Sequence, residues 1–543
     1  MKIVVADRIS DRGIALLREP GWQIVLPASS AWLAELADAE ALIVRSATRV
    51  TAELLDAAPR LRVVGRAGVG VDNIDLDSAT RRGVLVMNTP GGNAVSVAEH
   101  TLALLLALAR SVPQLNAAIH AGRWEKSGAR GTELRGKTLG LIGLGRVAFE
   151  VARRARSFDL CVLAHDPYIS EEVARDAGAE LVSLDDLFAR SDFVSLHAAL
   201  SPSTERMLNA AAIARMKPGA RLINTARGEL VDEAALAEAL RSGHLAGAAL
   251  DVFAEEPPRT SPLVGLPNVI ATPHVAGSTE EAQEEVGTLV AQQVRDYLAE
   301  GILRNAVNLP TLSAEQYRRL RPYLVLAERL GSLAAQVVAG RLGFIHISYA
   351  GEPAELGTSV LRNAVLTGIL NTVLDEKVNL VNAGPVASSR GLHVEELTRR
   401  REHGFPDTIE VAASPVAGEP PQVSVEGTVL HDSFPRVLRM DGIELESPLQ
   451  GTMLLLRNRD VPGVIGQVGT ILGSLGVNIA TFALGRREAT RAAEAIALIR
   501  LDGEVPESIL PSLRDIPAVT EVHLIRLPEA AGDEARASAR AFS

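Results

Sequence analysis

A glycine-rich segment between a strand-like run and a helical run constrains the fold of this chain most. Residues 138–142 are apolar, and Gly143-Leu144-Gly145-Arg146-Val147-Ala148 follows them in the pattern G-x-G-x-x-[G/A]. The first glycine permits a tight turn, the second lets another group approach the backbone, and the small sixth residue lets the helix pack closely on the strand. The segment therefore predicts a β-α-β unit, and with it a parallel sheet flanked by helices.

Apolar strand-like runs alternate with helical patterns over two stretches of the chain, residues 1–97 and 136–284. Continuous apolar runs separated by helices are typical of parallel sheets that are covered on both faces. We therefore predict two doubly wound α/β domains of the Rossmann or flavodoxin-like kind. The runs are residues 3–6, 41–44 and 61–65 in the first stretch, and 138–142, 160–163, 193–196, 221–224 and 248–251 in the second.

The remaining residues predict two smaller α+β domains. Residues 317–447 combine a helix at 360–374 with strands at 344–350, 378–382 and 422–430. Residues 451–526 follow the order strand, helix, strand, strand, helix, strand, which is ferredoxin-like. Residues 531–543, alanines with charges, are expected to form a frayed tail.

Composition excludes several classes of protein. The hydrophobic content of 47% and charged content of 22% are ordinary for a soluble globular chain. A formal charge of −11 disfavours nucleic acid as a partner. The single cysteine, Cys161, excludes an internal disulfide, no metal site is expected, and Cys161 itself is expected in a buried strand. The N-terminus lacks signal-peptide anatomy and the apolar run 102–109 is short for a membrane span, so we expect a cytoplasmic protein.

The glycine turn predicts a dinucleotide site. Asp166 ends the next strand, eighteen residues after Ala148. A carboxylate there accepts hydrogen bonds from a ribose diol and repels a 2′-phosphate, while the helix N-terminus suits a pyrophosphate. We therefore predict NAD rather than NADP; a plain structural turn and an aspartate cap before Pro167 are the alternatives. The segment Gly68-Val69-Gly70 lacks a third small residue and is interpreted as a loop lining the cleft.

Three polar residues that follow predicted strands suit the oxidation of a hydroxy acid. Arg227 can hold a carboxylate with two hydrogen bonds. His274 can take a hydroxyl proton, and Glu256 can orient that histidine. Glu255 stands beside Glu256 and leaves the choice of glutamate open, while Asp251 either binds the nicotinamide carboxamide or serves as a structural cap.

The chain also resembles a known family through these segments and several motifs upstream. It is similar to the D-isomer-specific 2-hydroxyacid dehydrogenases, and among them to the long-form D-3-phosphoglycerate dehydrogenases. The resemblance implies NAD-dependent oxidation of 3-phospho-D-glycerate to 3-phosphohydroxypyruvate, the first committed step of L-serine biosynthesis. The upstream motifs are Val44-Arg45-Ser46-Ala47-Thr48, Gly65-Arg66-Ala67-Gly68-Val69-Gly70-Val71-Asp72-Asn73 and Asn88-Thr89-Pro90.

The resemblance further implies domain boundaries and site residues. Residues 1–97 and 285–315 would form the substrate-binding domain, 98–284 the NAD-binding domain, 316–447 an intervening regulatory domain and 448–530 an ACT domain. Arg45 and Asn93 would face the substrate, with Arg45 on its phosphate; a hinge salt bridge is the alternative role for Arg45. Residues implied to contact NAD are Gly143, Gly145, Arg146, Val147, Asp166, Thr225, Ala226, Asp251 and Gly277.

The C-terminal segment Asp460-Val461-Pro462-Gly463 resembles the ACT effector signature. It implies that Asp460 meets the ammonium of an amino acid and Asn478 its polar groups, with L-serine as the effector. Some serine-responsive relatives carry an aromatic residue where this chain has Asn458, which puts serine feedback in doubt. A ligand-free dimerisation module is the alternative, and a homo-oligomer, first a tetramer, is expected.

Two other functions remain open at this point. The same fold can act on a different 2-hydroxy acid, such as glycerate or lactate. A binding protein that senses a dinucleotide without turnover is the second alternative.

Overall fold

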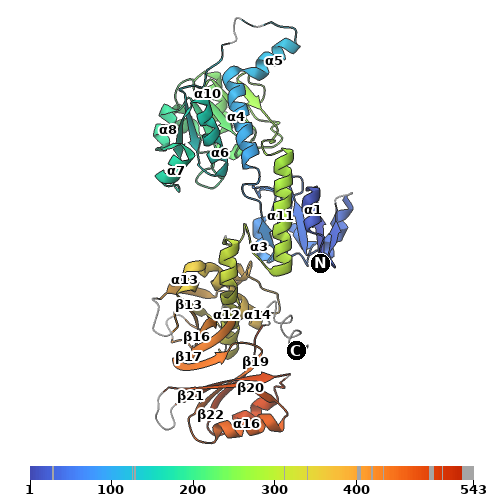
Figure 1. Cartoon of the computed structure of the whole chain (residues 1–543), viewed down its shortest axis with the longest axis vertical. Coiled ribbons are helices and arrows are strands. Elements are labelled where there is room, and N and C mark those ends of the chain that lie inside the picture. Colours follow the sequence, from blue (N-terminus) through green and yellow to red (C-terminus); the bar gives the residue numbers. More distant parts are fainter. Residues whose placement is uncertain are drawn as a thin grey trace.

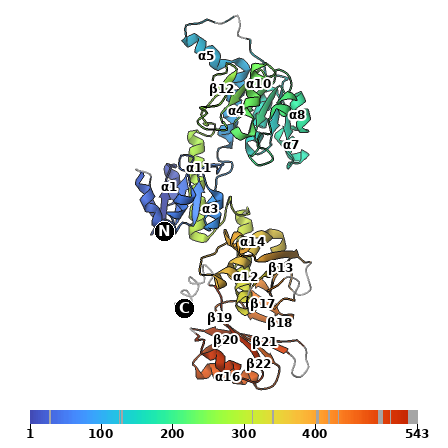
Figure 2. The same ribbon diagram turned by 180° about the vertical axis from the view of Figure 1, so that it is seen from behind.

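The computed structural model describes the chain except residues 27–29, 125, 127–129, 311, 339, 341, 400–404, 417–419, 432, 488–493, 504 and 529–543. The expected tail at 531–543 lies outside the described residues. Within the described residues four sheets mark four domains that follow one another along an elongated molecule (Figure 1). The second domain in sequence lies at one end, the first lies beside it, and the third and fourth continue to the other end, an order that is also visible from behind (Figure 2).

The first domain holds a five-stranded parallel sheet in the order β2-β1-β3-β4-β5. Its central strands are buried except at Lys2 and Arg66, as their continuous apolar runs predict. Side-chain caps begin the helices: Ser10, Thr51 and Asp75 each accept a hydrogen bond from a backbone N–H in the first turn. The elements are β1(Lys2–Val5), α1(Asp11–Leu16), β2(Gln23–Val25), η1(Ser30–Asp38), β3(Ala41–Val44), α2(Ala52–Asp56), β4(Val63–Arg66), α3(Leu76–Arg81) and β5(Leu85–Met87).

The second domain holds a seven-stranded parallel sheet in the order β12-β11-β10-β9-β6-β7-β8. The strand order reverses between β6 and β9, and open α/β sheets bind ligands at such a switch point. Cys161 begins β7, but its side chain is exposed, so the expectation of a buried cysteine was wrong. The elements are β6(Thr138–Ile142), α6(Arg146–Ala155), η2(Arg156–Phe158), β7(Cys161–His165), α7(Glu171–Ala177), β8(Glu180–Leu181), α8(Leu184–Arg190), β9(Phe193–Leu196), α9(Ala210–Ala214), β10(Arg221–Asn224), η3(Gly228–Leu230), α10(Glu233–Arg241), β11(Gly247–Leu250) and β12(Val269–Ala271).

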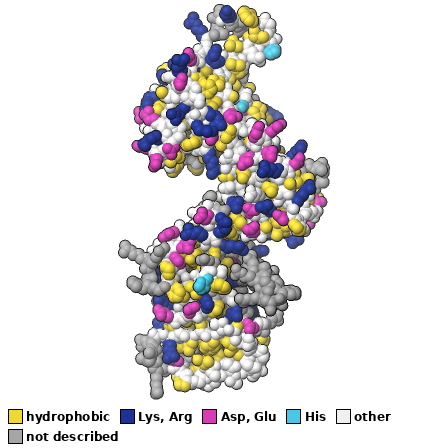
Figure 3. All heavy atoms as spheres, viewed as in Figure 1, with side chains coloured by type: hydrophobic (Ala, Val, Ile, Leu, Met, Phe, Trp, Pro, Cys, Tyr) yellow, Lys and Arg dark blue, Asp and Glu magenta, His cyan; other side chains and the backbone are white. Residues whose placement is uncertain are grey.

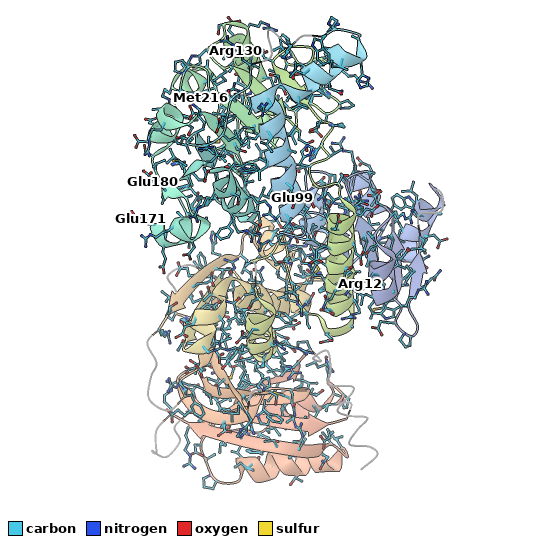
Figure 4. All side chains as sticks on the ribbon, turned by 45° about the horizontal axis from the view of Figure 1, so that its top comes forward. Arg12, Glu99, Arg130, Glu171, Glu180 and Met216 are labelled. Atoms are coloured by element: carbon cyan, nitrogen blue, oxygen red, sulfur yellow. The ribbon has the colours of Figure 1, made fainter. Side chains whose placement is uncertain are left out.

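Two long helices carry the chain between these domains. α4(Ala94–Arg110) leads into the second domain, and α11(Glu280–Glu300) returns to pack beside α1, where Arg12 lies (Figure 4). The two crossings are joined by a hydrogen bond of 2.7 Å between the hydroxyls of Ser96 and Thr279. In the described part of the chain no single helix is long and apolar enough to cross a membrane; α4 and α5(Val112–His120) pass that test only together, with a bend of 65°.

The third domain places α12(Ala314–Val337), α13(Glu352–Leu356), α14(Thr358–Val373) and α15(Ala383–Ser389) with a mixed six-stranded sheet, β14-β13-β15-β16-β17-β18. The strand predicted at 378–382 is wrong, because asparagine side chains take its backbone hydrogen bonds. Asn371 both donates to and accepts from the backbone of Val378, and Asn379 accepts from Val381. The strands are β13(Phe344–Ala350), β14(His393–Thr398), β15(Thr408–Ser414), β16(Val423–Leu430), β17(Phe434–Met440) and β18(Ile443–Pro448).

The fourth domain confirms the predicted β-α-β-β-α-β order and has an antiparallel sheet, β20-β21-β19-β22. Its attachment to the third domain is close. The Arg329 guanidinium on α12 donates to the carbonyls of Leu449 and Pro528 at 3.0 and 3.2 Å. A Cβ on Gly485 would lie 2.3 Å from the Glu444 carbonyl oxygen, so β20 packs directly on β18. The elements are β19(Thr452–Arg459), α16(Val464–Ser474), β20(Asn478–Arg486), β21(Glu494–Asp502), α17(Ile509–Arg514) and β22(Val519–Arg526).

Candidate active site

The candidate site lies where the first and second domains face each other. Arg227, Asp251 and His274 follow the neighbouring strands β10, β11 and β12, so the parallel sheet brings them to one edge. The loop after β4 approaches from the first domain: Asp72 Oδ2 lies 3.1 Å from Arg227 Nη2. A Cβ on Gly70 would lie 2.0 Å from the same Arg227 nitrogen, so this loop lines the cleft.

The glycine turn has the geometry that a dinucleotide pyrophosphate needs. Gly143 has a φ of 88°, and a Cβ there would lie 2.9 Å from the backbone of residues 197 and 198. At Gly145 a Cβ would meet only open space. Gly145 begins α6 without a side-chain cap, so the first N–H groups of this helix face outward for an anion. Ala148 is fully buried where the helix meets the sheet.

Asp166 braces this turn from the end of β7. Its Oδ2 accepts from the Leu144 N–H and its Oδ1 from the Tyr168 N–H, both at 2.9 Å. Each oxygen retains a second lone pair for a ribose hydroxyl, and that contact stays a prediction. Arg146 packs against the loop after β5, because a Cβ on Gly91 would lie 2.9 Å from its Cδ.

The other residues assigned to NAD or substrate lie around the two crossings. The Thr225 hydroxyl pairs with that of Thr101 at 2.8 Å and is buried. A Cβ on Gly277 would lie 2.7 Å from Asn93 Nδ2, so these two residues are in contact. Their ligand contacts, like those of Val147 and Ala226, remain predictions.

A histidine–glutamate pair is preformed in the cleft. His274 Nδ1 lies 2.8 Å from Glu256 Oε2, and the other oxygen of Glu256 accepts from the Phe253 N–H at 3.2 Å. The neighbouring Glu255 instead accepts from the Thr260 hydroxyl at 3.0 Å. The structure thereby separates the two glutamates, and Glu256 is the partner of His274. Because both side chains are partly exposed, a substrate can reach the imidazole.

Asp251 holds the loop that carries His274. Its Oδ1 accepts from the Thr272 hydroxyl and the Val275 N–H, and its Oδ2 accepts from the next N–H along the chain. Burial acts to raise the pKa of this carboxyl, but hydrogen bonds, first that from His100, outweigh burial and lower it. The Asp251 side chain is fully buried, which shows a structural role; contact with NAD stays a prediction.

Arginines gather on the substrate side of the cleft. Arg45 follows β3, and its Nη1 donates to the Arg8 carbonyl at 3.4 Å; within the described residues it forms no ion pair. Arg66 ends β4, and its Nε is buried without a partner. Burial, and then the charge of Arg227, lower the pKa of Arg66. Sequence reasoning missed Arg66, although its position at a strand end in the same motif as Gly68 was a signal.

The residues assigned to an effector are not brought together. Asp460 forms an ion pair of 3.3 Å with Arg486. Asn478 is exposed and donates to Asp502 at 2.7 Å, and it is not among the described residues that line the cavity beside Asp460.

Comparisons with known proteins agree with this architecture. Residues 102–276 match the NAD-binding domain of D-isomer specific 2-hydroxyacid dehydrogenases, 319–441 the D-3-phosphoglycerate dehydrogenase intervening domain and 452–518 the ACT domain. The chain is 40% identical to the D-3-phosphoglycerate dehydrogenases of Methanocaldococcus jannaschii and Bacillus subtilis, over 97% of this chain and 100% of each relative.

A solved structure, the TT0316 protein from Thermus thermophilus, is 38% identical with a TM-score of 0.51 and covers 56% of this chain and 100% of that chain. The parallel sheets, the glycine turn and the full-length identity lead to one assignment. This chain belongs to the D-3-phosphoglycerate dehydrogenases of the D-isomer-specific 2-hydroxyacid dehydrogenase family, which are NAD-dependent oxidoreductases, and it carries an intervening and an ACT domain.

Proposed function

We propose that this chain oxidises 3-phospho-D-glycerate to 3-phosphohydroxypyruvate with NAD, the first committed step of L-serine biosynthesis. The observation that carries the proposal is the preformed pair of His274 and Glu256 at the same sheet edge as Arg227. Relatives that are 40% identical over nearly the whole chain bear the name of this activity. The arginines of the first domain supply the positive charge that an anionic substrate requires.

The proton acceptor in this proposal is His274. The contact between His274 Nδ1 and the Glu256 carboxylate assigns the Nδ1 proton to that hydrogen bond, which leaves the Nε2 lone pair for the substrate. Nε2 takes the proton of the C2 hydroxyl as the C2 hydrogen leaves and the C2–O double bond forms. Glu256 then stabilises the imidazolium.

The substrate is held by arginines from both domains. Arg227 binds the carboxylate and polarises the C2 oxygen, with its guanidinium oriented by the Ala226 carbonyl at 2.7 Å. Arg45, which lacks an ion pair in the described part of the chain, binds the phosphate, and the half-buried Arg66, whose pKa is lowered by burial and then by the charge of Arg227, adds to the positive potential there. Closure of the cleft about the Ser96–Thr279 crossing excludes water.

Two features of the second domain suit NAD. There is open space at Gly145 for the pyrophosphate, and the start of α6 has no side-chain cap, so its backbone N–H groups can bind an anion. When bound there, NAD supplies the acceptor for the C2 hydride. Asp166 takes the adenosine ribose and favours NAD over NADP. Arg146, Val147, Thr225, Ala226, Asp251 and Gly277 complete this site in the proposal.

The domain boundaries and the assembly belong to the same proposal. Residues 1–97 and 285–315 bind substrate, 98–284 bind NAD, and 316–447 and 448–530 regulate. The enzyme is a cytoplasmic homotetramer, and an amino acid, with L-serine the first candidate, inhibits it through Asp460 of the ACT domain.

The test is NADH formation with 3-phospho-D-glycerate and with D-glycerate, each with and without millimolar L-serine. We expect turnover that prefers the phosphorylated acid. A preference for D-glycerate would keep the catalytic residues but assign another 2-hydroxy acid. No turnover on either acid would return the chain to a dinucleotide-sensing binding protein.

A further inference from the structure

One helix, α4, contacts both loops that carry the proposed catalytic residues. It is one of the two helices that join the second domain, the lobe at the top of Figure 3, to the rest of the molecule. The Thr101 hydroxyl on α4 pairs at 2.8 Å with that of Thr225, which stands two residues before Arg227. The preceding residue of the helix, His100, reaches the loop that follows β12. Adjacent side chains of α4 therefore hold two loops that are far apart in the sequence.

His100 donates a hydrogen bond to the loop after β12 through Nε2. This nitrogen lies 3.2 Å from the hydroxyl oxygen of Thr272 and 3.5 Å from Asp251 Oδ1. The Thr272 hydroxyl has a single proton and gives it to Asp251 Oδ1, because an ionised carboxylate can only accept. Toward His100 the Thr272 oxygen is therefore an acceptor, which assigns a proton to Nε2 of the imidazole.

This contact bears on His274, because Asp251 holds three consecutive N–H groups of the same loop. The His274 N–H donates to the Asp251 carbonyl oxygen at 2.8 Å. The next two N–H groups along the chain donate to the carboxylate oxygens Oδ1 and Oδ2, at 2.9 and 2.8 Å. His274 has a φ of 54°, which residues other than glycine seldom adopt, so its conformation depends on these bonds.

We propose that His100 is a positioning residue of the dehydrogenase site. Its Nε2–H ties Thr272 and Asp251 to α4 and so holds the His274 imidazole where it can take the proton of the C2 hydroxyl. Since Thr101 ties the loop of Arg227 to the same helix, α4 sets the placement of the proton acceptor relative to the carboxylate-binding arginine. The inference rests on the proposed function and adds a residue that orients the same site through Asp251.

The test compares His100→Gln, His100→Asn and His100→Leu in the full-length protein. Glutamine places an amide N–H at about the reach of the imidazole Nε2, asparagine is one carbon shorter, and leucine has no donor. His100→Asn and His100→Leu should lower kcat about tenfold or more, because small misplacements of a reacting group are costly. KM for 3-phospho-D-glycerate should stay within about twofold, because Arg227 still binds the carboxylate. His100→Gln should keep kcat within about threefold of the wild type.

Hydrogen exchange of the protein without NAD and substrate is a second measurement, independent of turnover. The amides of residues 274–276 should exchange at least about tenfold faster in His100→Asn and His100→Leu, and near the wild-type rate in His100→Gln. His244→Leu is the matched control. His244 is also partly buried and contacts the Ile213 carbonyl at 3.0 Å, but it lies before β11, at the opposite end of that strand from Asp251. This variant should change neither kcat nor the exchange of residues 274–276.

Wild-type kcat in His100→Asn and His100→Leu, or unchanged exchange of residues 274–276, would overturn the inference. Equal losses in His100→Gln and His100→Leu would also overturn it, because the imidazole would then act by packing and not as a donor. The His100 side chain is 24% exposed and suits polar replacements, so the comparison of glutamine with asparagine remains if His100→Leu does not fold. Absence of turnover in the wild type would overturn the proposed function, whereas the exchange rates would still show whether His100 holds the loop.

Discussion

The helices α6 and α16 are among those that begin after a glycine without a side-chain cap, but their surroundings differ. At α6 the neighbouring carboxylate of Asp166 already accepts two backbone hydrogen bonds and holds the glycine turn. At α16 the neighbouring amide of Asn458 is buried with its oxygen unpaired, above an apolar cavity. An uncapped helix start therefore lies beside a fully hydrogen-bonded side chain in the second domain, and beside a side chain with an unpaired oxygen in the fourth.

The proposed catalytic residues are likewise held by hydrogen bonds. His274 is held by Glu256, and the loop that carries it is held by both oxygens of Asp251. Catalysis requires groups fixed before the substrate arrives, and preformed hydrogen bonds achieve this. The contrast is that the polar groups of the proposed catalytic site are hydrogen-bonded in advance, whereas Asn458 Oδ1 beside α16 has no partner.

The largest effect should come from the braced histidine. His274→Asn should lower kcat at least about 10²-fold, the usual scale for losing a general base, while NAD binding stays unchanged. Steady-state NADH formation and fluorescence titration of NADH measure the two quantities. Glu255→Gln is the control, because Glu255 contacts Thr260 rather than His274, and should turn over normally. Near-normal turnover by His274→Asn would remove this residue from the proton transfer.

Asp166, which holds the glycine turn, should determine the choice between NAD and NADP. Asp166→Arg should move the preference from NAD toward NADP by about tenfold or more in kcat/KM, because the ribose acceptor is lost and a 2′-phosphate gains a cation. Asp166→Asn keeps an acceptor for the Leu144 N–H. It therefore distinguishes the effect of losing the negative charge from the effect of losing this hydrogen bond. An unchanged ratio in Asp166→Arg would place the ribose elsewhere.

The smallest effect should come from the contact between the two domains. The Asp72 side chain is 68% exposed and pairs with Arg227, which we propose also binds the substrate carboxylate. Asp72→Asn should lower KM for the substrate about two- to fivefold at unchanged kcat, since exposed ion pairs contribute at most about 1 kcal/mol. Asp56→Asn, which breaks the exposed pair with Arg82, is the matched control. A fall in kcat without a change in KM would show that Asp72 positions Arg227 instead.

The positions of the central strands and the conformation of the glycine turn were predictable, because both depend on the sequence pattern of a few neighbouring residues. The apolar runs identified the central strands of both parallel sheets but not the outer strands β2, β5, β8 and β12, and Gly143 has the positive φ that a tight turn demands. The predicted fold class is confirmed by the two parallel sheets. It was predictable because a chain that alternates strands and helices can adopt few topologies. The segment at 378–382 failed because its valines suit a strand, while Asn371, Asn379 and Asn382 satisfy its backbone through side chains.

The sequence by itself determined the two parallel sheets, the ferredoxin-like domain and the residue types available for chemistry, because periodicity and turn chemistry act over a few residues. The tertiary structure gave Glu256, the glutamate that the family resemblance implied, to His274 and gave Glu255 to Thr260, and it brought Arg66 within range of the Arg227 charge. It alone paired Asn478 with Asp502 rather than bringing it to Asp460, and left Asn458 Oδ1 without a hydrogen-bond partner. These outcomes depend on distances between segments far apart in the chain, which packing sets and local pattern does not record.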